Sequence, residues 1–228
     1  MARLIRHPHS VSVLDVGRTA EGQPYLVMEY VRGRDLALLM HEEGPLEFHR
    51  ILDILVQVLD ALREVHGKQV IHRDLKPGNV LVTTMQDGSD FARITDFGLA
   101  VRLSDAAPGQ SQSATVCGTP DFMSPEQCRG EAIDPRSDLY SVGAMLYLLL
   151  TEHLPFQAAS PAIVMQMQVS ERFKDPREVA RQRRIPEELA HITNKALAKH
   201  PADRFQSAEE FLESLRQAAL HRRPNVGA

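Results

Sequence analysis

Alternating apolar and polar positions mark the first part of the chain. Residues 11–16 read V-S-V-L-D-V, and residues 25–31 form a second β-rich run after the turn sequence E-G-Q-P. Two such runs joined by a short turn predict a β-hairpin. Residues 79–83 and 91–95 are further β-rich runs on either side of Q-D-G-S, which predicts another turn.

Helical periodicity dominates the rest of the chain. One apolar stripe over residues 47–66 predicts an amphipathic helix that ends near Gly67, and Asp35 can cap a short helix running to Glu43. Residues 135–151 begin with proline and become apolar on most faces, which is typical of a buried helix. Two more stripes cover 185–196 and 208–219, the second with a capping box predicted between Ser207 and Glu210. The pattern therefore favours an α+β fold with a helix-dominated body.

Composition narrows the class of protein. With 228 residues, 43% hydrophobic and 25% charged, a disordered or fibrous chain is excluded. The net charge of −4 gives no basic excess for nucleic acid, and the basic run at 181–184 is predicted to be a solvated loop. Cys117 and Cys128 form no disulfide framework, which favours a reducing compartment, here the cytoplasm. The longest apolar run, 142–150, is too short to span a membrane.

Candidate chemistry lies in two motifs. H-R-D-L-K-P-G-N starts at His72, between a predicted helix and a predicted strand, and D-F-G starts at Asp96 after another strand. Asp74, Asn79 and Asp96 supply hard oxygen ligands and a carboxylate base, and oxygen ligands that share a site with phosphates suit Mg²⁺. Lys76 adds a cation close to Asp74. Such a set is typical of phosphoryl transfer, in which positioning and electrostatics carry most of the catalysis.

With S-P-E at residues 124–126, these motifs resemble those of the protein Ser/Thr kinase family, most closely its bacterial-type branch. The resemblance covers about residues 2–219. It implies a protein-kinase-like fold, mostly the helical C-lobe with a remnant of the N-lobe sheet. Residues 1–31 would be the N-lobe remnant and hinge, 32–220 the C-lobe, and 221–228 a tail. It also implies ATP and Mg²⁺ as cofactors and protein Ser/Thr hydroxyls as substrates.

The resemblance assigns a role to each matching position. Asp74 would orient the substrate hydroxyl and accept its proton, Lys76 would touch the γ-phosphate, and Asn79 and Asp96 would hold Mg²⁺. The hinge L-V-M-E-Y-V would bind adenine, with Met28 as gatekeeper and main-chain groups from Glu29 and Val31. The ATP-site residues implied in addition to Lys76, Asn79 and Asp96 are Met28, Glu29, Tyr30, Val31 and Leu81, the last as the floor of the adenine pocket.

The resemblance also covers the segment that receives the substrate and its regulation. Gly118, Thr119 and Pro120 would form the substrate loop, with Thr119 near Asp74. Arg73 before the catalytic aspartate marks kinases that are switched by phosphorylation of the activation loop, with Thr115 as first candidate and Ser113 as second. A homodimer would serve autophosphorylation. Three structural residues are implied as well: a buried pair of Glu126 with Arg204, and Asp138, which would hold the catalytic loop.

The N-terminal part departs from the family pattern. No two glycines are two residues apart, so the chain has no G-x-G-x-x-G; its first lysine is Lys68 and its first acidic residue is Asp15. We therefore expect an N-terminally truncated form of a Ser/Thr protein kinase, with a poorly ordered hairpin at 11–31. Two alternatives stay open. One is a catalytically dead C-lobe that acts as a protein-binding or regulatory module, and the other is a small-molecule phosphotransferase, against which the substrate-loop resemblance speaks.

Overall fold

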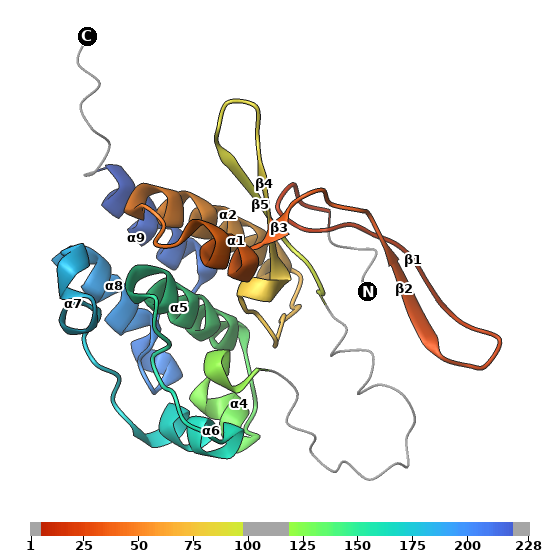
Figure 1. Cartoon of the computed structure of the whole chain (residues 1–228). Coiled ribbons are helices and arrows are strands. Elements are labelled where there is room, and N and C mark those ends of the chain that lie inside the picture. The colour runs from red at the N-terminus through yellow and green to blue at the C-terminus, as the bar shows by residue number, and fades with distance from the viewer. Residues whose placement is uncertain (1–5, 98–118, 221–228) are drawn as a thin grey trace.

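A β-hairpin projects from a helical body (Figure 1). The computed structural model describes residues 6–97 and 119–220. Strands β1 (Val13–Arg18) and β2 (Pro24–Met28) pair antiparallel, with Val16 opposite Leu26. The predicted hairpin is confirmed, although β2 ends three residues earlier than the apolar pattern indicated.

A second sheet connects this hairpin to the helices. It contains β3 (Arg34–Asp35), β4 (Val80–Thr84) and β5 (Asp90–Ile94) in the antiparallel order β3-β4-β5. The segment before β1 lies along the free edge of β5, because Val11 N donates to the carbonyl of Ile94 (2.8 Å) and Ile94 N donates to that of His9 (2.9 Å). These main-chain bonds anchor the base of the hairpin to the sheet.

The long periodic helices form as predicted. Helix α2 (Phe48–Gly67) buries its apolar stripe, and α5 (Pro135–Thr151) is buried over most of its surface. The other two predicted stripes belong to α8 (Glu187–Ala196) and α9 (Ala208–Leu220). Helix α2 packs against α9 and β5, and α5 packs against α8 and α2, so the core lies between these elements.

Short elements complete the body. Helix α1 (Leu36–Glu43) is capped by Asp35, whose carboxylate accepts from Leu38 N at 2.9 Å, as predicted. Three helices had no signal in the apolar pattern: α4 (Pro125–Arg129), α6 (Pro161–Ser170) and α7 (Pro176–Val179). The 3₁₀ turns are η2 (Pro77–Asn79), η3 (Pro120–Phe122), η4 (Arg181–Arg183) and η5 (Pro201–Asp203). No helix within the described ranges is long and apolar enough to cross a membrane.

Two local predictions need correction. Glu210 N donates to the hydroxyl of Ser207 (3.1 Å), but the Glu210 carboxylate accepts from Gln206 N (2.7 Å), so the predicted reciprocal box is incomplete. A complete capping box instead starts α4, between Ser124 and Gln127.

The basic run at 181–184 is not simply a solvated loop. The guanidinium of Arg183 donates to the carbonyls of Leu149 (3.0 Å) and Leu150 (3.3 Å), at the C-terminal end of α5, and also to the carbonyl of Leu46. The last carbonyls of a helix lack partners within the helix, and a cation placed there satisfies them and complements the helix dipole.

Candidate active site

A buried carboxylate on α5 binds the main chain of the catalytic loop, the segment that starts at His72. Asp138 is 1% exposed and accepts from the main-chain N–H groups of His72 (2.9 Å) and Arg73 (3.0 Å). Burial alone would raise the pKa of Asp138, but the hydrogen bond from His66 and the neighbouring histidines outweigh burial and hold this pKa below its usual value. Arg73 has a φ of 72°, a left-handed conformation that Asp138 helps to hold.

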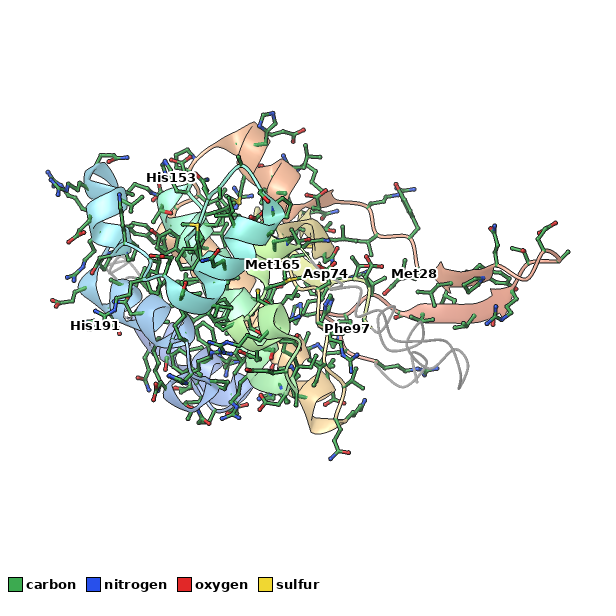
Figure 2. The ribbon with its side chains drawn as sticks, turned by 90° about the horizontal axis from the view of Figure 1, so that it is seen from below. Met28, Asp74, Phe97, His153, Met165 and His191 are labelled. Atoms are coloured by element: carbon green, nitrogen blue, oxygen red, sulfur yellow. The ribbon has the colours of Figure 1, made fainter. Side chains whose placement is uncertain are left out.

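Two histidines extend this support. His66, on α2, places Nε2 2.8 Å from Asp138 Oδ2, so α2, α5 and the catalytic loop meet at one carboxylate. The buried ring of His72 has Nε2 2.8 Å from the Thr95 carbonyl and contacts the ring of Phe97 edge-on, with centroids 4.9 Å apart. His72 therefore connects the catalytic loop to the D-F-G segment from within the core. Figure 2 shows Asp74 and Phe97 at the junction between the helical body and the strands.

The reactive groups gather around Asp74. Lys76 Nζ donates to Asp74 Oδ2 (2.7 Å) and to Thr119 Oγ1 (2.9 Å). Thr119 N donates to Asp74 Oδ1 (3.1 Å), and the Thr119 hydroxyl lies 3.4 Å from the same oxygen. A carboxylate, an ammonium group and a hydroxyl thus share one hydrogen-bonded cluster, although Thr119 and Asp74 are 45 residues apart.

Asn79 is hydrogen-bonded to this cluster, and its main chain is hydrogen-bonded to the residue before Asp96. Asn79 is buried at the end of η2 and donates from Nδ2 to the Asp74 carbonyl (2.7 Å), so Oδ1 is the atom it can offer a cation. The amide of Thr95 donates to the Asn79 carbonyl (2.9 Å). The main chain of Asp96, the next residue after Thr95, therefore lies close to the main chain of Asn79. One carboxylate and one amide oxygen fit Mg²⁺, which proteins bind through few side chains together with phosphate oxygens.

The hinge residues lie where β2 ends. Thr95 Oγ1 is 3.8 Å from the sulfur of Met28, so the expected gatekeeper lies beside the D-F-G segment. The amide of Glu29 donates to the Ser12 carbonyl (3.0 Å), so the Glu29 carbonyl is the main-chain group that this residue could offer a ligand. Tyr30 is 87% exposed, whereas Val31 and Leu81 are half-buried.

The substrate loop is described only from Thr119 onward. Pro120 opens η3, directly after the threonine that contacts Asp74. Gly118 and the two candidate phosphorylation sites, Ser113 and Thr115, lie outside the described residues. Arg73 is described, and its carbonyl accepts from Gln127 Nε2 at 2.7 Å, which ties the catalytic loop to α4.

A buried ion pair joins α4, which follows η3, to the segment before α9. Arg204 donates two 2.7 Å hydrogen bonds to the two carboxylate oxygens of Glu126, and the residues are 1% and 5% exposed. Ser137 Oγ donates to the same carboxylate at 2.6 Å. Burial raises the pKa of Glu126, but the hydrogen bonds from Arg204 and Ser137 lower it by more, so this pKa lies below its ordinary value.

Sequence reasoning missed three polar residues that support the site: Gln127, Ser137 and Gln168. Gln127 holds the Arg73 carbonyl, Ser137 holds Glu126, and Gln168 holds two carbonyls of η3. Gln127 was detectable, because Ser124 with Gln three residues later is a capping-box signal. The other two carry no local signal, since their partners are distant in the sequence.

Comparisons with known proteins identify the family of the chain. The profile of the protein kinase domain family matches residues 1–215. The chain is 42% identical to the serine/threonine-protein kinase pkn3 of Myxococcus xanthus over 97% of this chain and 41% of pkn3. It is 39% identical to PknB of Mycolicibacterium smegmatis over 94% of this chain and 34% of PknB. The chain thus spans about two fifths or less of the length of these relatives.

A solved structure has the same architecture. The crystal structure of the Mycobacterium tuberculosis PknI kinase domain superposes with a TM-score of 0.73 at 26% identity, covering 96% of this chain and 75% of that one. The profile match spans nearly the whole chain, and the segment that starts at His72 is in contact with Thr95 and Phe97. The chain therefore belongs to the protein kinase domain family.

Proposed function

We propose that this protein is a Ser/Thr protein kinase, which transfers the γ-phosphate of ATP to serine or threonine hydroxyls of proteins. The cluster of Asp74, Lys76 and Thr119 carries the proposal. It holds a hydroxyl-bearing side chain within 3.4 Å of a carboxylate oxygen and 2.9 Å of an ammonium group. An incoming hydroxyl group at this place would meet a proton acceptor and a cation together.

Each side chain of the cluster has a chemical part in this proposal. Asp74 orients the substrate hydroxyl and accepts its proton, which is general base catalysis. Lys76 stabilises negative charge on the phosphoryl group during transfer. Asn79 and Asp96 would hold Mg²⁺, and the bound ion would neutralise charge on the phosphate oxygens. The hinge residues Met28 to Val31, with Leu81, would bind the adenine ring.

One observation favours a second candidate function. The 228 residues contain no G-x-G-x-x-G and no lysine before Lys68. Because these elements position the nucleotide phosphates in the family, the chain by itself would transfer phosphate slowly. A C-lobe that binds proteins and regulates another kinase needs no nucleotide. Binding of Mg²⁺-ATP separates the two functions.

The first test replaces the proposed base. Asp74→Asn in the full-length gene product should lower phosphorylation of a protein substrate by at least about 100-fold, since general base catalysis contributes factors of about 10² to 10⁴. Asp53→Asn, on the exposed face of α2, is the matched control and should leave the rate unchanged. The measurement is transfer of labelled phosphate from ATP with Mg²⁺. A wild-type protein that phosphorylates no serine or threonine would contradict the proposal, as would an Asp74→Asn variant of normal rate.

Regulation, assembly and location belong to the same proposal. Phosphorylation of Thr115, or of Ser113, would place charge near Arg73, and a homodimer would allow one copy to phosphorylate the other. We propose a cytoplasmic location for this domain, in keeping with its two cysteines, which are too few for a disulfide framework.

A further inference from the structure

A fully buried glutamine joins three elements beneath the substrate loop. Gln168 lies on α6 and is 0% exposed. Its Nε2 donates to the carbonyls of Pro120 (3.1 Å) and Asp121 (3.0 Å), and its Oε1 accepts from the hydroxyl of Tyr140 at 2.5 Å. Both amide protons and the amide oxygen therefore have partners. Replacing Gln168 by an apolar residue would leave buried polar groups unpaired, which is costly.

The two carbonyls that Gln168 holds belong to η3, which follows Thr119 directly. Thr119 in turn contacts Asp74 and Lys76. From the other side, Ser141 Oγ on α5 donates to the Phe122 carbonyl at 2.8 Å. The turn η3, which begins at the last residue of the substrate loop, is thus held between α5 and α6 by side-chain hydrogen bonds to its main chain. A shift of these bonds would move Thr119 relative to Asp74.

Gln168 is itself fixed at its main chain. Lys199 Nζ donates to the Gln168 carbonyl at 2.7 Å and lies 4.2 Å from the centroid of the Phe156 ring. The Gln168 side chain is oriented by Tyr140, which is also fully buried. An amide held at both ends has little freedom, so the position of η3 follows the position of α6.

We propose that Gln168 is a positioning residue that holds the substrate loop in register with Asp74 for a protein substrate. The proposal rests on the proposed kinase function. It predicts that the loss of the two hydrogen bonds to Pro120 and Asp121 impairs use of the protein substrate and leaves ATP binding unchanged, because the hydrogen bonds of the Gln168 side chain go to η3 and Tyr140 and not to the nucleotide-site residues.

The test compares two glutamines of one helix. Gln168→Met keeps the length of the side chain and removes its donors, and Gln166→Met is the matched control, because Gln166 is exposed on α6. In the full-length gene product, Gln168→Met should lower kcat/KM for the protein substrate by about 10- to 100-fold, mainly through KM, since small misplacements cost rates of this order. KM for ATP should stay within about twofold. A merely structural role would lower kcat in proportion to the folded fraction and leave both KM values unchanged, which would overturn the proposal.

A second readout does not depend on activity. The amides of Phe122 and Met123 donate within η3 to the carbonyls of Thr119 (3.0 Å) and Pro120 (3.4 Å). Their hydrogen exchange should be faster in Gln168→Met than in Gln166→Met, and equal rates would refute the positioning role. If wild-type protein transfers no phosphate, the proposed function fails and exchange still decides this inference. If Gln168→Met does not fold, Tyr140→Phe, which removes only the group that orients the amide, should show the same changes at smaller size, and unchanged exchange and KM there would count against the proposal.

Discussion

Single buried charges in this protein are matched by several partners each. Asp138 accepts from two main-chain amides and lies beside His66. Glu126 accepts from Nη1 and Nη2 of Arg204 and from the hydroxyl of Ser137. A buried carboxylate without such partners would lose several kcal/mol of solvation. We therefore expect a large loss of stability when one charged partner is removed and the other charge stays buried.

Glu126→Gln tests this at the residue scale. The variant should lower the free energy of unfolding at pH 7 by about 3–5 kcal/mol, because Arg204 stays buried without its counter-charge. Glu64→Gln, in the exposed pair with Lys68, should change it by less than about 1 kcal/mol. Urea unfolding measures both, and equal losses in the two variants would contradict the argument.

The same carboxylate predicts a pH dependence. The folded-state pKa of Glu126 is lowered from 4.5, so its contribution is present above pH 4.5 and is lost as the pH falls through the folded-state pKa. The wild type should thus lose stability below about pH 4.5. The slope of the free energy of unfolding against pH should be smaller in Glu126→Gln, because this variant has no carboxyl group at position 126 to protonate.

Helices with one apolar stripe were predictable, and so was α5 as a long apolar run, whereas α6 and the very short elements α4, α7 and β3 were not. Helices α2 and α9 have one apolar face each, whereas α6 is apolar on several sides and shows no stripe. Strand β3 has two residues and exists because β4, far along the chain, pairs with it. Periodicity reports burial of one face, so it carries no signal for an element that is defined by a distant partner.

The close contact between helices α5 and α8 depends on a glycine, Gly143. A Cβ atom at Gly143 would lie 2.7 Å from the Cβ of Ala196, too close for two carbon atoms. Gly143→Ala should therefore push the helices apart and lower the free energy of unfolding by about 1–3 kcal/mol. Gly67→Ala is the control, since nothing lies within 4 Å of that position, and it should be neutral or stabilising by up to about 1 kcal/mol. Thermal unfolding measures the stability of both variants. A Gly143→Ala variant as stable as the wild type would contradict the prediction, because it would show that α8 can move away at no cost.

At the scale of the whole molecule, stability is distributed unevenly. The β1–β2 hairpin projects from the body (Figure 1), and its apolar residues are largely exposed, with Leu14 at 54% and Val27 at 41%. Two strands alone form a marginal sheet in water. Strands β4 and β5 are also a hairpin, but β5 packs on α2 and β4 contacts α1. Gln57 of α2 also accepts a hydrogen bond from Ala92 N and donates one to the Asp90 carbonyl.

Hydrogen exchange should rank these parts of the molecule. Amides of β1 and β2 should exchange faster than those of α5, because local opening of the hairpin exposes little buried apolar surface. The β4–β5 amides are the internal control and should be protected more than those of β1–β2. Equal protection of the first hairpin and α5 in a monomer would contradict this prediction.

The sequence by itself determined most of the regular local structure and indicated the class of chemistry that we propose. Apolar patterns predicted the long helices, turn residues predicted the first hairpin and the turn between β4 and β5, and eight consecutive residues from His72 indicated phosphoryl transfer. The resemblance also led us to expect Asp138 and the Glu126–Arg204 pair. Only the tertiary structure decided that Gln168, on a helix with no stripe, holds the substrate loop 48 residues earlier in the chain. Local patterns encode which face of an element is buried, whereas a hydrogen bond between distant residues depends on how the helices pack together.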